Sequence, residues 1–509
     1  MNHLFKPKQA GIVLLALLLF ASCKKDYAVL EDEPVDTFSK KNNPDVVFYA
    51  LAGGTVLDKY NAAAPETILN SAAITGLQSG EKIASIDFRP ATGQLYGISS
   101  GSRVYVINAE TGAARMIGAG PFTPALTGSY IALDFNPTVD RMRVVTSNGQ
   151  NLRLNPETGA VAAIDGSING QAGAMISEVA YTNNFAGAAT TTLYDIDVVS
   201  QKLFIQTPPN AGTLTEVDSL HLKVTGKGGF DISPDGIALG LFEVNKKATL
   251  FTVDLTTGLA KILTKYDKEI MYNGIAIPTR PVAYAVSSNS LLIFNPTNTS
   301  SVISKTITGL QAGENIAGID FRPLNGQLYA LGSSSRIYTI NASSGAAVMV
   351  AILSTPLSGS DFGFDFNPVV DRIRIVSNTG QNLRFNPNDG ALIIDGSINP
   401  AGVAITAVAY ANNFAGTTST MLFDIDINTD QLYLQNPPNA GTLVAVGSLG
   451  INADAMSGFD IGGTSGMAYA LLSSGGSTRL YNINRTTGAA SALGNFSSSV
   501  TGFTIGLGF

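Results

Sequence analysis

The sequence feature that most constrains the fold is an internal duplication. Residues 134–156, DFNPTVDRMRVVTSNGQNLRLNP, return as residues 365–387, DFNPVVDRIRIVSNTGQNLRFNP, 231 positions further along the chain. Other repeated pairs flank this one: ITGLQSGEKIASIDFRP at 74–90 with ITGLQAGENIAGIDFRP at 307–323, and YTNNFAG at 181–187 with YANNFAG at 410–416. Their offsets, 233 and 229, differ by only four positions. The chain after residue 45 therefore consists of two near-equal units.

A shorter period of about 45 residues runs inside each unit. Each module has an apolar strand ending in Asp-Phe or Asp-Ile, a turn with Pro or Gly, and further short strands separated by turn signals. Charged residues make up 14% of the chain, against about 25% in a typical soluble protein. Gly, Ser, Thr and Asn alternate instead with β-branched and aromatic residues, which favours short strands over helices. A four-stranded module at this spacing predicts an all-β fold of the β-propeller type.

The fifth module of each unit is split between its two ends. Residues 46–69 match residues 282–304 but have no first strand of their own, and residues 273–278 and 503–508 could supply it. This arrangement predicts two tandem five-bladed propellers, the first over residues 46–279 and the second over residues 280–509. The alternative is one ten-bladed ring, because residues 275–286 have the length and pattern of the first hairpin of other modules. Ten blades would exceed the usual four to eight.

The N-terminus has the three parts of a bacterial export signal. Residues 1–22 contain two lysines, an apolar run and two small residues directly before Cys23, the one cysteine of the chain. This resembles a lipobox, so we expect a lipoprotein signal peptide over 1–22 and acylation of Cys23. An ordinary signal peptide with a chance cysteine is the alternative.

The residues after Cys23 indicate where such a lipoprotein would reside. Residues 23–45 are polar and lack a helix or strand period, so we expect the lipidated cysteine to be followed by a flexible tether. Lys24 at the sorting position is typical of the outer membrane. The acidic residues 31–33 resemble surface-export signals of some Bacteroidota lipoproteins, and a solvated linker explains them equally well. We therefore expect a lipid-anchored outer-membrane protein on the periplasmic or cell-surface face.

Several consecutive motifs match a known family in order. IDFRPATGQLY, FNPTVDRMRVV, GQNLRLNP, YTNNFAG and PPNAGTL resemble the family called domain of unknown function 4394, present in two tandem copies. The family is bacterial and largely exported. The resemblance implies a propeller-type fold and transfers no catalytic residues.

The sequence offers few groups for catalysis. After the signal peptide there is one histidine, His221, and the second copy has Gly450 in its place. Cys23 is assigned to the lipid, and we find neither a Walker A loop nor a GxSxG elbow. The formal net charge is −7, and no basic cluster follows Lys25, so nucleic-acid binding is not expected.

Aspartates that end the first strand of a module are the candidate metal ligands. In a propeller such strands line the central channel, where several carboxylates could hold Ca²⁺; otherwise we expect no cofactor. The alternative is that each aspartate caps its own turn through the backbone N–H two residues on. These residues are Asp87, Asp134 and Asp231 in the first copy and Asp320, Asp365 and Asp460 in the second.

The duplicated segment itself is the candidate ligand site. Its arginines alternate along one strand, with a third in the facing strand, and amides lie nearby, so they could bind carboxylate, phosphate or glycan hydroxyls. The alternative is an internal ion pair between Asp140 and an arginine. The residues are Arg141, Arg143, Gln150, Asn151 and Arg153, repeated as Arg372, Arg374, Gln381, Asn382 and Arg384.

These observations favour a non-catalytic lipoprotein whose propellers bind a ligand or protein partner, such as a glycan or an envelope protein. One alternative is a metal-dependent hydrolase or lyase of the lactonase-type propeller kind, which is an analogy of fold alone. A structural scaffold in an envelope assembly is the other.

Overall fold

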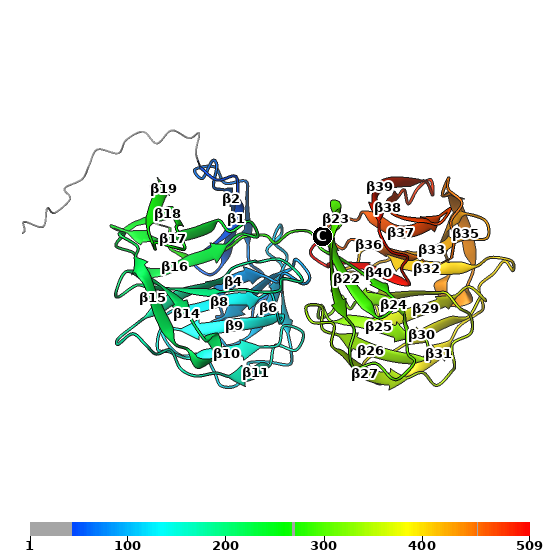
Figure 1. Cartoon of the computed structure of the whole chain (residues 1–509), viewed down its shortest axis with the longest axis horizontal. Coiled ribbons are helices and arrows are strands. Elements are labelled where there is room, and N and C mark those ends of the chain that lie inside the picture. The colour runs from blue at the N-terminus through cyan, green and yellow to red at the C-terminus, as the bar shows by residue number, and fades with distance from the viewer. Residues whose placement is uncertain (1–42, 267–269, 456) are drawn as a thin grey trace, which may run out of the picture. The chain divides into compact units, whose positions relative to one another are not determined.

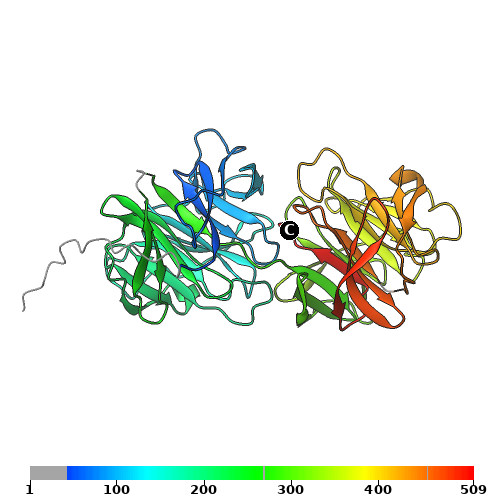
Figure 2. The same cartoon turned by 90° about the horizontal axis from the view of Figure 1, so that it is seen from above.

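The computed structural model describes residues 43–266, 270–455 and 457–509. The signal peptide, Cys23 and most of the tether lie outside the described residues. The regular structure that is described consists of ten four-stranded antiparallel sheets, together with two single 3₁₀ turns, η2 (Pro209–Ala211) and η3 (Pro438–Ala440). In Figures 1 and 2 the sheets coloured blue to green belong to the first copy and those coloured green to red to the second. The predicted all-β class is confirmed.

The first copy forms five blades, whose strands follow one another from the innermost outward. Blade 1 is β20 (Tyr272–Ala276), β1 (Val47–Ala52), β2 (Val56–Asn61) and β3 (Asn70–Ala73); blade 2 is β4 (Ile83–Phe88), β5 (Leu95–Ser99), β6 (Val104–Ile107) and β7 (Ala114–Ile117); blade 3 is β8 (Ile131–Asn136), β9 (Arg141–Thr146), β10 (Asn151–Leu154) and β11 (Val161–Ile164); blade 4 is β12 (Ile176–Tyr181), β13 (Leu193–Asp197), β14 (Lys202–Gln206) and β15 (Leu214–Ser219); blade 5 is β16 (Thr225–Ile232), β17 (Ala238–Val244), β18 (Lys247–Val253) and β19 (Ala260–Lys265).

The second copy forms five more. Blade 6 is β40 (Gly502–Ile505), β21 (Ala283–Ser287), β22 (Ser290–Asn295) and β23 (Asn298–Thr306); blade 7 is β24 (Ile316–Phe321), β25 (Leu328–Gly332), β26 (Arg336–Ile340) and β27 (Ala347–Ile352); blade 8 is β28 (Phe362–Asn367), β29 (Arg372–Ser377), β30 (Asn382–Phe385) and β31 (Leu392–Ile394); blade 9 is β32 (Ile405–Tyr410), β33 (Leu422–Asp426), β34 (Gln431–Gln435) and β35 (Leu443–Ser448); blade 10 is β36 (Gly458–Ile461), β37 (Ala468–Ser474), β38 (Ser477–Ile483) and β39 (Ala490–Phe496).

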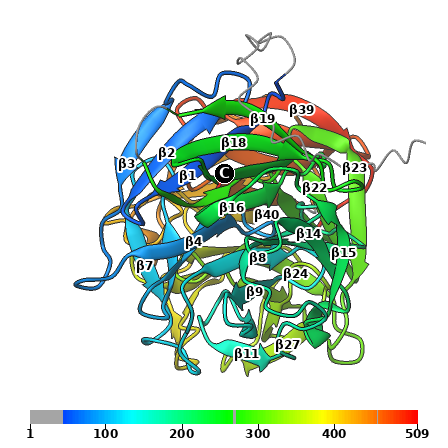
Figure 3. The ribbon, with the colours of Figure 1, turned by 90° about the vertical axis from the view of Figure 1, so that its left-hand side faces the viewer.

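Each copy closes on itself through its own last strand. β20 pairs antiparallel with β1, where Tyr49 lies opposite Ala276, and β40 pairs with β21, where Ala283 lies opposite Ile505. The innermost strands contact one another in the cycles β20–β4–β8–β12–β16 and β40–β24–β28–β32–β36, each returning to its first strand. Figure 3 shows the blades of the first ring following one another around its centre. The ten-bladed alternative is wrong, because β20 completes blade 1 and does not begin a sixth blade.

The core of each ring lies between neighbouring blades. Both faces of an inner strand are covered, and all six residues of β12 are buried, whereas the outermost strand β11 is partly exposed along its length. One apolar cluster joins Tyr96 of blade 2 to Phe135, Met142 and Leu154 of blade 3. Burial on both faces explains why inner strands read as apolar runs that end in a single polar residue.

Candidate functional site

The arginine-rich hairpin of blade 3 is folded into the protein interior. Arg143 on β9 lies opposite Arg153 on β10, and Arg143 is 2% exposed. Its guanidinium donates to Asp165 Oδ2 at 2.5 Å, to Asn151 Oδ1 at 2.8 Å and to Asn210 Oδ1 at 2.6 Å. Arg153 donates to both oxygens of Asp165, at 2.8 and 2.9 Å. Asp165 therefore bonds to two arginines at once.

The Asp165 network ties blade 3 to blade 4. Asn151 donates to the carbonyls of Gly166 and Pro209, at 2.9 and 3.0 Å, and Arg143 donates to the hydroxyl of Tyr181 at 3.3 Å. Burial raises the pKa of Asp165, but the hydrogen bonds from Arg153 and Arg143 outweigh it and hold that pKa below its ordinary value. The carboxylate therefore stays charged between its two arginines.

The second copy builds the same network. Arg374 is 1% exposed, and with Arg384 it surrounds Asp395. The distances are 2.6 Å from Arg374 to Asp395, 2.7 Å to Asn382 and 2.7 Å to Asn439, and 2.6 and 2.9 Å from Arg384 to Asp395. A network repeated in both rings is expected of a structural device.

The remaining residues of the predicted ligand site also bond to the protein. Arg141 donates to the carbonyl of Asp140 at 2.8 Å, and Gln150 to that of Ala125 at 3.0 Å. In the second copy Arg372 donates to the carbonyl of Asp371 at 2.9 Å and Gln381 to that of Pro356 at 2.9 Å. The polar side chains of this site are thus engaged in contacts within the protein.

Asp140 forms an ion pair with an arginine outside its own hairpin. The Asp140 carboxylate accepts from Arg89 Nε at 2.8 Å and Nη2 at 2.5 Å, and neither Arg141 nor Arg143 bonds to it. Arg89 follows β4 in blade 2, so the pair joins blades 2 and 3. Alternation within one hairpin could not reveal this, because the arginine comes from the preceding module.

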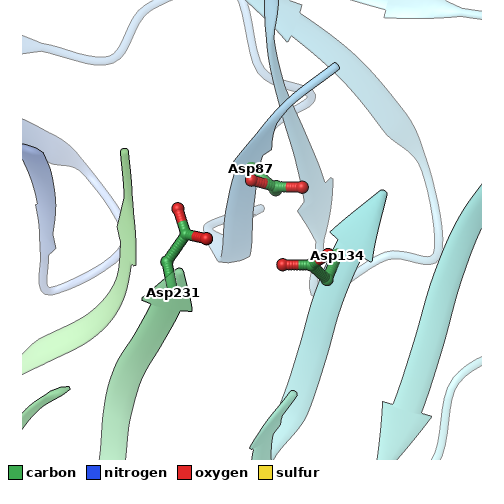
Figure 4. Close-up of side chains that lie close together, drawn as sticks. All are labelled: Asp87, Asp134 and Asp231. Atoms are coloured by element: carbon green, nitrogen blue, oxygen red, sulfur yellow. The ribbon is translucent and has the colours of Figure 1, made fainter. Parts of the chain in front are cut away.

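The predicted aspartates converge at the centre of each ring. Asp87 on β4, Asp134 on β8 and Asp231 on β16 point toward one another in Figure 4, and each is 1% exposed. One carboxylate oxygen from each lies within 4.8 Å of the others, and the same holds for Asp320, Asp365 and Asp460. We call these sets the first and second aspartate triads.

Each member of the first triad bonds to the next blade and does not cap its own turn. Asp87 accepts from the N–H of Phe135 in blade 3 at 2.7 Å, and Asp231 accepts from that of Ile277 after β20 at 2.6 Å. Asp134 accepts from Tyr181 in blade 4 at 3.1 Å. The turn-cap alternative is wrong, because the N–H two residues on is not the partner of any of the three. These carboxylates connect innermost strands.

Electrostatics of the triads follow from burial and mutual repulsion. Burial, and then the neighbouring carboxylates, raise the pKa values of Asp87 and Asp134 well above the ordinary range, and burial raises the pKa of Asp231 to about 7. In the second triad burial raises the pKa of Asp460 to about 6. Three buried carboxylates this close need protons or a cation between them.

The mouth of the first channel carries additional acceptor oxygens. Glu178 on β12 is 4% exposed and makes no hydrogen bond among the described residues, and Asn273 Oδ1 is likewise buried without a partner. Both line a cavity of about 20 Å³ together with Lys227, which is exposed. Burial, and then the charge of Asp231, raise the pKa of Glu178 well above its ordinary value.

Two buried carboxylates escaped sequence reasoning altogether. Asp195 on β13 and Asp424 on β33 are 0% exposed, and neither has a hydrogen-bond partner among the described residues. Burial raises the pKa of Asp195 well above its ordinary value, against a smaller opposing effect of Arg143. The motif LYDID, which returns as LFDID in the second copy, is the sequence signal that could have identified these two aspartates.

A groove on the second ring was not predicted either. It lies between blades 9 and 10 and has a volume of about 760 Å³. Met421, Val444 and Met467 line it with exposed fractions of 50%, 51% and 42%. Arg485 is the one charged residue of the lining, with its guanidinium 5.9 Å from the ring centre of Phe423.

The first ring has different chemistry at the equivalent positions of this groove. Thr192, Thr215 and Leu255 stand where the second ring has Met421, Val444 and Arg485. Glu216 stands where the second ring has Ala445, and it pairs with Lys202 at 2.7 Å. The apolar groove is therefore a property of the second ring.

His221 is an exposed residue with a φ of 49°, as expected of a histidine in a loop.

No helix in the described part of the chain is long and apolar enough to cross a membrane.

Comparison with curated proteins gives no match. Among solved structures the chain is similar to PorZ, described as an essential bacterial surface component of the type-IX secretion system of Porphyromonas gingivalis, at 13% identity and a TM-score of 0.26. That match covers 90% of this chain and 58% of PorZ, so the chain spans less than two thirds of it. A TM-score this low supports no inference about fold or function.

The comparison with protein families gives a match in both rings. The model described as "Domain of unknown function (DUF4394)" matches residues 56–276 and again residues 290–504. The first match runs from β2 to β20 and the second from β22 to β40. Each copy of the family thus corresponds to one closed ring, and the chain belongs to the DUF4394 family.

Proposed function

We propose that this protein is a non-catalytic binding protein of the bacterial cell envelope, anchored through Cys23. In this proposal the groove between blades 9 and 10 binds a polypeptide segment that carries apolar side chains and a carboxylate. The exposed methionines and valine around the groove are the observation that carries the proposal. Large exposed apolar patches on a folded domain mark sites of interaction, and methionine adapts its shape to varied partners.

Charge identifies the class of partner. Arg485 makes no hydrogen bond or ion pair among the described residues, and no acid lines the groove. A guanidinium beside apolar surface binds a carboxylate well, because both of its N–H edges can donate. An acidic-apolar segment therefore fits the groove better than a basic or a purely polar one.

The dimensions of the channels favour binding over catalysis. Two cavities lined by residues of the innermost strands, one in each ring, measure about 20 Å³ and 10 Å³, which is space for about one water molecule. An organic substrate needs a pocket of roughly 300 Å³ or more. The triads are thus poor candidates for the metal centre of a hydrolase.

The test replaces groove residues of the second ring with the residues at the equivalent positions of the first ring. The variant Met421→Thr/Val444→Thr/Arg485→Leu keeps every main-chain contact and takes its residues from the equivalent first-ring positions. Tagged wild type and variant are recovered from envelope extracts, and the co-purified proteins are quantified. We expect a stoichiometric partner of the wild type to fall at least tenfold in the variant.

The reciprocal variant Thr192→Met/Thr215→Val/Leu255→Arg in the first ring is the control and should leave that partner in place. Equal recovery by wild type and second-ring variant, with unchanged unfolding, would show that the groove is not the binding site.

A further inference from the structure

We propose that the central channel of the first ring binds one calcium ion, held by Asp87, Asp134 and Asp231 beneath Glu178 and Asn273. The second ring, although its triad is the same, lacks the other features of this site. The inference is independent of the groove proposed above.

The three triad oxygens lie close to the spacing that a cation requires. Because they lie within 4.8 Å of one another, one ion at their centre would be at most about 2.8 Å from each, and small side-chain shifts would bring these contacts into the range of calcium–oxygen bonds, about 2.3–2.6 Å. The carboxylates are held in place by the backbone N–H groups of Phe135 and Ile277. A carboxylate oxygen that accepts one hydrogen bond still has a lone pair for an ion.

The buried carboxylate of Glu178 favours a cation over shared protons. Protons could neutralise the triad by themselves, but they would leave Glu178 buried near Asp231 without a partner of opposite charge. Glu178 adds a fourth carboxylate that is 4% exposed and lines the same cavity. Buried acceptor oxygens without donors are costly unless a cation or an ordered water serves them. A calcium ion at the triad would offset the charge of Glu178, and a water in the cavity would donate to Asn273 Oδ1.

The second ring shows the same triad without the cation features. Thr504 replaces Ala276, and its hydroxyl lies 2.9 Å from Asp320 and 2.9 Å from Asp460, so it bridges two triad members. Ala407 stands in place of Glu178. Thr501 stands in place of Asn273 and donates to the carbonyl of Ile316 at 2.7 Å. The second ring therefore has fewer acceptors without a partner than the first.

Lys227 is the competing cation. It lies exposed at the mouth of the same cavity, with no ion pair among the described residues. If its ammonium group neutralised Glu178, the site would have little affinity for calcium. Calcium binding by the wild-type chain separates the two cases.

The experiment measures calcium stoichiometry and affinity on the mature chain after treatment with a chelator, by native mass spectrometry and calorimetry with Ca²⁺ as the titrant. We expect one ion per chain. Glu178→Gln, which leaves all the bonds between triad and backbone intact, should weaken binding at least tenfold. Asp134→Asn should do the same, while its counterpart Asp365→Asn in the second ring should leave binding unchanged.

A gain of binding makes the test independent of loss of fold. The triple variant Thr501→Asn/Ala407→Glu/Thr504→Ala gives the second ring the first ring's residues at these positions and should raise the stoichiometry to two. No calcium uptake by the wild type, two equal sites in the wild type, or binding that Glu178→Gln leaves unchanged would each overturn the proposal.

Discussion

Buried charge in this protein is concentrated where several side chains share it. Asp165 is bonded by Arg143 and Arg153, and the whole group lies between two blades. Removing Arg143 leaves Asp165 paired with the partly exposed Arg153, but it takes a donor away from the side-chain oxygens of Asn151 and Asn210. The arginines therefore contribute to stability through blade-to-blade contact.

Replacing Arg143 with Met is predicted to destabilise the first ring by about 2–5 kcal/mol, because each buried acceptor left without a donor costs about 1–3 kcal/mol. The acceptors affected are the side-chain oxygens of Asn151 and Asn210. Urea unfolding of the wild type and variant measures the change. Arg141→Met is the control, since Arg141 bonds only to a neighbouring carbonyl, and it should cost less than about 1 kcal/mol. Equal and small losses would place Arg143 outside a stabilising network.

The partners of Arg143 show which contacts could not be predicted from the sequence. The sequence indicated that Arg153 lies in the strand facing Arg143, and the structure pairs these two residues. The strand pattern could not supply Asp165 or Asn210, which come from a later segment and from the next blade. Both are repeated, as Asp395 and Asn439. Comparing the copies therefore identifies the network members, while their pairing requires the ring geometry.

At the scale of strands, the rings depend on close approach at the centre. A Cβ on Gly229 of β16 would lie 2.2 Å from the backbone nitrogen of Ile275 on β20. On Gly274 of β20 the nearest atoms would be 3.6 Å away, at Ile86. Innermost strands thus meet backbone to backbone at some positions and leave space for a methyl group at others.

Gly229→Ala is predicted to destabilise the first ring by about 1–3 kcal/mol, as expected when a packed core is overfilled. Gly274→Ala, on the neighbouring strand, should be neutral or slightly stabilising, because alanine restricts the unfolded chain. Thermal unfolding of the two variants measures the difference. Similar melting temperatures would contradict the close contact between β16 and β20.

The outermost strand of blade 7 is an unprotected edge. β27 has no charged residue, and Val348 and Ile352 are 65% and 61% exposed. Its counterpart β7 is shorter and has Arg115 where β27 has Val348. An apolar edge strand can pair with another chain, and a charge on it prevents this.

Val348→Arg is accordingly predicted to lower self-association without changing stability by more than about 0.5 kcal/mol, as is usual for surface positions. Light scattering against protein concentration measures the association. The reciprocal Arg115→Val should raise it. If Val348→Arg scattered as strongly as the wild type, β27 would not be the edge responsible.

At the scale of the whole molecule, the rings were predictable and the groove was not. Ring number follows from the repeat length and from the terminal strands β20 and β40, which complete the split blades. The groove arises from exposed residues that differ between the copies, such as Met421 and Thr192. Strand patterns carry no signal for such positions, because exposed side chains are not constrained by burial.

Anchoring is a property of the whole chain, and it is predicted to depend on Cys23. Cys23→Ala should abolish incorporation of labelled palmitate, because the acylated sulfur is removed, and should release the protein from the membrane fraction. Ser22→Ala retains a small residue before the cysteine and should be labelled normally. Equal labelling of Cys23→Ala would contradict the lipoprotein proposal.

The two rings share one scaffold, and we propose that only the second carries a partner-binding groove. Photo-crosslinking inside the native envelope tests this difference most directly, with a benzophenone amino acid placed at Met421 in one chain and at Thr192 in another. We predict an adduct from Met421 whose crosslinked peptide contains apolar residues and an aspartate or glutamate, and no such adduct from Thr192. Adducts of equal yield from both positions, or none from Met421, would contradict the proposed difference between the rings.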